Sequence, residues 1–234
     1  MNNKQIIGVI GGMGPQASCE LYRLLIEGAR RDFGARNNDD FPEILIDSVP
    51  VPDFLGNTEK MEEAARMLES RVRRLTEHGA TIITMACNTA CILSNRLQKQ
   101  TDKPLISVVD EVVNDVVGKS TNVLLLASPT SLRLGLYQLA LSRYNVSCVV
   151  PKQKDFRELE YIIRGVLGGE KRDPLMRKLV HIAERYVDDS IDGIVLGCTE
   201  LPLVFPSTYR IPVYDSLSIL AESVLKRYYT KEDV

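Results

Sequence analysis

GATIITMACNTA (Gly79–Ala90) and SIDGIVLGCTEL (Ser190–Leu201) decide the fold, because they share one pattern although nearly half of the chain separates them. Each is a short apolar run that ends in a small residue and a cysteine, with a threonine close behind. Short apolar runs bounded by turn-forming residues are typical of buried β-strands. The pattern therefore predicts two equivalent strands, each with a cysteine, Cys87 or Cys198, at its carboxyl end.

Two further segments repeat in the same order around these strands. A strand with a turn-forming loop comes before each cysteine, in IIGVIGGMGP (Ile6–Pro15) and NVLLLASPTS (Asn122–Ser131). A strand led by proline comes after each one, in KPLISVVD (Lys103–Asp110) and RIPVYDS (Arg210–Ser216). Three matching segments in one order indicate an internal repeat, and therefore two related lobes.

Apolar runs alternate with helical patterns along the whole chain. The expected strands, read as buried on both faces as in parallel sheets, are Ile6–Ile10, Ile44–Val49, Thr81–Met85, Leu105–Val109, Val123–Ala127, Val146–Val150, Ile191–Leu196 and Ile211–Tyr214. The expected helices begin near Pro15, run over Thr58–His78, open at Asp155 with a capping-box-like Glu158, and open at Asp173–Pro174.

This alternation predicts an α/β fold of two pseudo-symmetric lobes, each with a central, mostly parallel sheet flanked by helices. We expect an N-terminal lobe of residues 1–118 plus 209–234 that carries Cys87, and a C-terminal lobe of residues 119–208 that carries Cys198. Loops at the carboxyl ends of parallel strands form ligand sites. If the lobes face each other, the two thiols therefore lie on opposite sides of one cleft.

Composition narrows the class of protein. Hydrophobic residues make up 44% of the 234 residues and charged residues 26%, an ordinary globular balance. The net charge of −2 gives no reason to expect a nucleic-acid partner. We find neither a signal-peptide pattern nor an apolar run long enough to span a bilayer, which predicts a cytoplasmic protein without membrane contact. Five cysteines, with no CxxC pair, predict free thiols and no metal site.

Two opposed thiols suit racemisation at a carbon atom. One group must remove the proton of Cα on one face while a second returns a proton on the other, and the roles swap in reverse. We expect the strand-to-helix turns after both cysteines to favour thiolates. The same turns offer hydrogen-bond donors for a substrate carboxylate, namely Asn88, Thr89, Ser128, Thr130, Ser131 and Thr199.

GGMGP (Gly11–Pro15), ACNTA (Ala86–Ala90) and GCTE (Gly197–Glu200) resemble three signatures of the aspartate/glutamate racemase superfamily, and the overall pattern is nearest to that of aspartate racemase. The resemblance implies a racemase of aspartate or a related amino acid, without pyridoxal phosphate, other cofactor or metal, and commonly a homodimer. It implies that Cys87 and Cys198 are the acid/base pair. It also places Met13, Phe54 and Glu200 at the substrate.

This chain departs from the family pattern where a side-chain carboxylate is gripped. Phe54 stands where aspartate racemases carry an arginine. Leu167 lies in the stretch where a second basic residue is expected. Replacing a bidentate arginine by phenylalanine substitutes an apolar wall for a carboxylate clamp. Three other cations could bind the side-chain carboxylate instead, although the sequence does not place them at the site: Arg133, Arg164 and Lys171.

Other readings stay open at this point. The isomerases of the same superfamily include glutamate racemase and the maleate- and hydantoin-type enzymes, which use equivalent cysteines on other acids. GMGPQA (Gly12–Ala17) also fits a loose dinucleotide fingerprint, with Asp47 as the ribose acid, which is a feature of nicotinamide-dependent oxidoreductases. A non-catalytic binding module is the third alternative. Solvent deuterium exchange at Cα separates a racemase from a binding module.

Overall fold

Two four-stranded sheets organise the computed structural model, which describes residues 5–53 and 59–230. The strands of the first are β1 (Ile6–Gly11), β2 (Glu43–Ser48), β3 (Ile82–Met85) and β4 (Leu105–Ile106). Those of the second are β5 (Asn122–Ala127), β6 (Ser147–Val149), β7 (Gly193–Gly197) and β8 (Val213–Asp215). Every pairing in both sheets is parallel, which confirms the predicted fold class.

The two sheets have the same strand order, β2-β1-β3-β4 and β6-β5-β7-β8. The repeat seen in the sequence is therefore a structural repeat, in which β1, β3 and β4 correspond to β5, β7 and β8. Because all strands in a sheet run the same way, the loops after β1 and β3 leave from one edge. The loops after β5 and β7 do the same in the second sheet.

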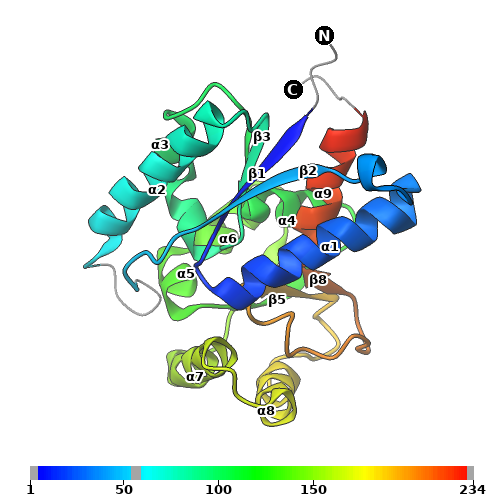
Figure 1. Cartoon of the computed structure of the whole chain (residues 1–234). Coiled ribbons are helices and arrows are strands. Elements are labelled where there is room, and N and C mark those ends of the chain that lie inside the picture. The colour runs from blue at the N-terminus through cyan, green and yellow to red at the C-terminus, as the bar shows by residue number, and fades with distance from the viewer. Residues whose placement is uncertain (1–4, 54–58, 231–234) are drawn as a thin grey trace.

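Helices cover both sheets (Figure 1). They are α1 (Pro15–Phe33), α2 (Met61–Glu77), α3 (Ser94–Gln98), α4 (Val108–Val116), α5 (Pro129–Leu134), α6 (Leu136–Ser142), α7 (Phe156–Leu167), α8 (Arg172–Glu184) and α9 (Ser216–Thr230). α1 begins at Pro15 as predicted and runs alongside α9, whereas α7 and α8 pack together at one end of the molecule. Across the described ranges, no helix is long and apolar enough to cross a membrane.

The central strands are buried on both faces, as their unbroken apolar runs predict. β3 and β7 have no exposed residue, and β1 and β5 are only partly exposed at their first residue. The prediction that both faces of the strand are buried is wrong for β2, where Ile46 is 43% exposed. β2 is an edge strand, so its outer side has no neighbouring strand to cover it.

Two local expectations need correction. The run Leu105–Val109 is not one strand, because the Ser107 hydroxyl caps α4 by accepting the Asp110 amide at 3.3 Å, which ends β4 at Ile106. Asp155 does not cap α7 either. A 3₁₀ turn precedes that helix, and the Asp155 carboxylate instead accepts from the Tyr186 hydroxyl and pairs with Arg185 at 3.2 Å.

The assignment of residues 209–234 to the N-terminal lobe also changes at β8. This strand pairs with β7, so residues 213–215 lie in the second sheet, with Cys198. The helix that follows, α9, packs against α1 and α4 of the predicted N-terminal lobe. The other lobe boundaries stay a prediction.

Asp215 joins β8 to α9 and supplies the cap of that helix. Its carboxylate accepts from the amides of Leu217 at 2.9 Å and Ser218 at 3.2 Å. We expect Asp215→Ala to lower the free energy of unfolding by about 1 kcal/mol, a fall in melting temperature of about 2–4 °C. Asp215→Asn retains an acceptor oxygen and should lose less in the same thermal melt. An alanine variant that melts with the wild type would contradict the capping role.

Candidate active site

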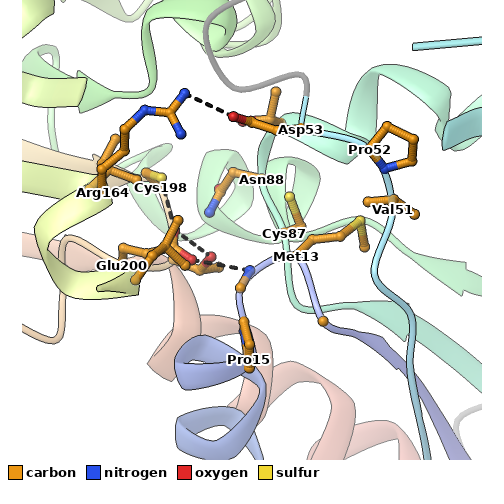
Figure 2. Close-up of a pocket in the computed structure, with 16 residues that line it drawn as sticks. Met13, Pro15, Val51, Pro52, Asp53, Cys87, Asn88, Arg164, Cys198 and Glu200 are labelled. Atoms are coloured by element: carbon orange, nitrogen blue, oxygen red, sulfur yellow. Dashed lines mark hydrogen bonds and ion pairs between the residues drawn. The ribbon is translucent and has the colours of Figure 1, made fainter. Parts of the chain in front are cut away.

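A cavity of about 310 Å³ lies where the carboxyl ends of β1, β3 and β7 meet. Cys87 and Cys198 both line it, one from each half of the repeat (Figure 2). Both side chains are buried, with 7% and 3% exposed. The volume is large enough for a ligand of the size of a single amino acid.

The loop after β1 forms one wall of the cavity and depends on two glycines. Gly12 has φ +90°, and a Cβ atom there would lie 2.5 Å from the Val49 carbonyl oxygen. At Gly14 a Cβ atom would lie 2.2 Å from Leu167 Cδ2 and 3.0 Å from Glu200 Oε1. Glycine therefore lets this loop touch both the end of α7 and the segment after β7.

The two thiols do not lie at the start of full helices, contrary to expectation. A five-residue 3₁₀ segment, Thr89–Leu93, follows Cys87, and only turns follow Cys198. Burial raises the pKa of Cys87 to about 12, and the nearby Glu200 carboxylate adds to this, while the amides of Ala90 and Thr89 oppose it. Burial, together with Glu200, also raises the pKa of Cys198 well above its ordinary value. The predicted stabilisation of thiolates is therefore wrong for both cysteines of this structure.

Glu200 is a buried carboxylate bonded by three donors. Oε2 accepts from Cys198 Sγ at 3.0 Å and from Thr199 Oγ1 at 3.1 Å, and Oε1 accepts from the Gly14 amide at 3.3 Å. Burial raises the pKa of Glu200, and these hydrogen bonds lower it in part. Figure 2 shows the carboxylate beside Cys198 and the backbone that precedes Pro15.

Asn88 is held from both ends of its amide. The Tyr137 hydroxyl donates to Oδ1, and Nδ2 donates to Ser216 Oγ at 3.1 Å. An amide nitrogen carries two hydrogens, so the second remains for a ligand in the cavity that Asn88 lines. Tyr137 had no signal in the sequence, because it lies outside the repeated motifs. Ser216 ends the repeated segment RIPVYDS (Arg210–Ser216), but nothing in that segment pointed to a contact with Asn88.

The other predicted donors separate into two groups. Thr89 and Thr199 line the cavity, whereas Ser128, Thr130 and Ser131 are buried away from its lining. Ser128 Oγ accepts from the Ser131 amide at 3.1 Å and lies 2.9 Å from Thr89 Oγ1. The Ser128 loop therefore supports a lining residue instead of facing the cavity itself.

Among the three candidate cations, Arg164 reaches the cavity. It pairs with Asp53 at 2.9 Å, across the mouth shown in Figure 2, and with Glu160 at 2.9 Å on its own helix. Arg133 lies over the Phe156 ring at 5.8 Å, and Lys171 is an exposed residue that precedes α8. Phe54 lies outside the described residues.

Apolar side chains make up the rest of the lining. Met13 and Leu167 were predicted, and the structure adds Val51, Pro52 and Ile163. Val51 and Pro52 belong to the stretch VPDFLGN (51–57), which drew attention only through its missing arginine. Ile163 could have been found from the helical spacing, because it is four residues before Leu167 on α7.

The remaining candidates lie elsewhere. Asp47, the ribose acid of the dinucleotide reading, is not in the lining and pairs with Arg71 at 3.6 Å and Arg74 at 3.4 Å. All five cysteines are free thiols. Cys19 is exposed, whereas a cysteine in an apolar segment is usually buried. The described residues contain no cluster of three or more side chains arranged to hold a metal ion.

Comparison with known proteins decides the family. Residues 10–224, almost the whole chain, match the model of the Asp/Glu/hydantoin racemase family. The chain belongs to this family. It is accordingly an enzyme of the superfamily of amino-acid racemases that act without pyridoxal phosphate. The family match leaves the loose dinucleotide fingerprint in Gly12–Ala17 without support.

Relatives of this racemase-family chain cover nearly its full length. It is 23% identical to the broad specificity amino-acid racemase RacX of Bacillus subtilis (strain 168), over 95% of this chain and 98% of that protein. The structure of Picrophilus torridus aspartate racemase matches with a TM-score of 0.82 and 27% identity, covering 96% and 94% of the two chains. An aspartate racemase homologue from Pyrococcus horikoshii OT3 matches with a TM-score of 0.76 and 27% identity, covering 96% and 99%.

The raised thiol pKa values have a direct chemical consequence. Only the thiolate is alkylated, so the carboxamidomethylation of Cys87 by iodoacetamide should accelerate about tenfold for each pH unit between pH 7 and pH 9. Exposed Cys19 should be labelled first at neutral pH. Peptide mass spectrometry measures each site separately. A plateau in the rate at Cys87 below pH 9 would show that its thiol ionises far more easily than its burial predicts.

Proposed function

We propose that this enzyme racemises an amino acid by proton transfer at Cα between two thiols, Cys87 on one face and Cys198 on the other. One observation carries the proposal: equivalent strand ends of two repeated halves deliver both thiols to one small cavity. A racemase needs chemically matched groups on opposite faces, and the repeat supplies such a pair.

The proposed reaction needs one thiolate and one thiol in each turnover. The thiolate takes the proton as the Cα–H bond breaks, and the opposite thiol donates its own proton to Cα as the new bond forms. The first thiol is then protonated and the second ionised, so the enzyme is ready for the reverse direction. The substrate carboxylate, held by Asn88 and Thr89, spreads the charge that develops on Cα.

We further propose that the preferred substrates have uncharged side chains. Support comes from the apolar wall made by Met13, Val51, Pro52, Ile163 and Leu167. Within the described ranges Arg164 is the cation of the lining, and both Asp53 and Glu160 already pair with it. A second carboxylate on aspartate or glutamate would therefore compete with these acids. The broad specificity in the name of RacX agrees with a substrate range beyond the acidic amino acids.

Removing either thiol should slow racemisation by orders of magnitude, while α-proton exchange of one enantiomer continues. Cys87→Ser and Cys198→Ser should each lower kcat by about 10²–10⁴-fold, the range for loss of an acid/base group. Each variant should still exchange the α-proton of one enantiomer in deuterium oxide, followed by mass spectrometry, because the other thiol remains. Cys19→Ser makes the same change on the exposed side of α1 and should behave as wild type. Near-full turnover in a folded Cys87→Ser or Cys198→Ser variant is incompatible with the proposal.

The substrate range can be tested with L- and D-amino acids, scored by chiral chromatography without added cofactor. We expect kcat/KM for alanine, methionine, leucine and phenylalanine to include values above those for aspartate and glutamate. Leu167→Arg should shift the ratio toward the acidic pair, because it places a cation in the wall. Leu139→Arg adds the same charge at an exposed position of α6, outside the cavity lining, and should leave the ratio unchanged. A wild-type enzyme that strongly prefers aspartate would refute the assignment.

A further inference from the structure

Among the described residues that line the cavity, Glu200 is a charged side chain without an ion pair, whereas Asp53 pairs with Arg164. Its side chain lines the cavity but is only 3% exposed. Each of its three hydrogen-bond donors is neutral: a thiol, a hydroxyl and a backbone amide. No ion pair joins it to any lysine, arginine or histidine in residues 5–53 and 59–230.

A buried carboxylate without a cation is unfavourable, because neutral donors replace only part of its hydration. The cation nearest in the lining, Arg164, is already committed to Asp53 and Glu160. The surrounding wall is apolar, so it adds no positive charge. The chain therefore builds an anionic position in the cavity and leaves its counter-charge to the ligand.

We propose that Glu200 is the receptor for the α-ammonium group of the substrate; this assignment rests on the proposed racemase function. The geometry agrees with it, because Oε2 lies 3.0 Å from Cys198 Sγ. An ammonium group is attached directly to Cα, so pairing it with Glu200 brings Cα next to that thiol. A substrate held only by its carboxylate would lack this second anchor.

The pairing also explains how buried thiols become reactive. The Glu200 charge raises the pKa of both thiols and so helps to keep them protonated. An ammonium group offsets that charge and favours the thiolate, since an adjacent positive charge stabilises an anion. Substrates with an amine thus activate the site on binding. Maleate and 2-hydroxy acids, which have no amine, do not.

Binding of matched pairs tests the receptor role. Isothermal titration would compare alanine, leucine, methionine and phenylalanine with the 2-hydroxy acids of the same skeletons. Wild-type protein should bind at least one amino acid about tenfold or more tightly than its hydroxy acid. Glu200→Gln, which is nearly isosteric, should lose that preference, while Glu200→Asp should retain part of it. Glu184→Gln, on the exposed face of α8, should change nothing.

A second readout separates charge from simple packing. Glu200→Gln should speed carboxamidomethylation of Cys87 several-fold at fixed pH, because removing the Glu200 charge removes one cause that raises the pKa of this thiol. A residue that acts only through packing would not produce this change in a variant with a wild-type melting temperature. The Glu184→Gln protein is again the control.

The outcomes discriminate between the two proposals. Retention of amine preference in Glu200→Gln, or wild-type binding that favours the hydroxy acids or detects none of the eight compounds, overturns the ammonium receptor. An unchanged alkylation rate at Cys87 overturns the electrostatic part. Loss of amine preference in a protein that shows no deuterium exchange into any amino acid would leave the receptor standing and remove the racemase. Deuterium exchange that survives with unchanged KM in Glu200→Gln would leave the racemase function standing and remove the ammonium receptor.

Discussion

The parallel pairing of β1 with β3, and of β5 with β7, is the constraint on which the site depends. Parallel strands place their carboxyl ends at one edge, so a residue that follows a central strand is fixed within the small range that a turn permits. The same strand order in both sheets applies this rule twice. Two residues remote in sequence, Cys87 and Cys198, thus reach one cavity.

Polar contacts between the halves keep this arrangement in register. Tyr137, from the second half, donates to Asn88 in the first, and Ser128 contacts Thr89. On the opposite wall, Gln16 Nε2 donates to the Leu167 carbonyl at 2.9 Å. Most of these groups are buried, and a buried polar group that lacks a hydrogen-bond partner lowers the stability of the folded state. The halves are therefore held by interactions that also orient lining residues, which is how a cavity can be preorganised for a small ligand.

Sequence reasoning succeeded where one residue type has one structural meaning. Pro15 begins α1, the apolar runs of β1, β3, β5 and β7 are buried, and each cysteine follows the strand that the repeat predicts. It failed where the outcome depends on competing partners. Asp155 looks like a helix cap but finds Tyr186 and Arg185, which lie about thirty positions further on. No local pattern could reveal that Arg164 would meet Asp53, since each belongs to a different half.

The thiols show why local chemistry can also mislead. A strand-to-helix turn after each cysteine suggested ionised sulfur, because backbone amides stabilise anions. The amides of Thr89 and Ala90 do act on Cys87 in that direction, but desolvation outweighs them and Glu200 adds a like charge. The sequence reveals these amide donors but not how deeply the Cys87 thiol is buried. The balance between the two becomes visible only when the sheet, the loop at Gly14 and the end of α7 close around the same small volume.

A site of this kind resolves a conflict inherent in thiol-based proton transfer. A thiolate that is stable in the empty enzyme would be a weak base and would be open to oxidation. A thiol protected by burial and by a neighbouring carboxylate is strongly basic once ionised, but it needs a source of positive charge to ionise at neutral pH. An amino acid brings that charge on the atom next to the proton to be moved. In the proposed mechanism, the protein supplies the unpaired anion and the ligand supplies the cation, so the thiols stay protonated until a molecule with an amine occupies the cavity.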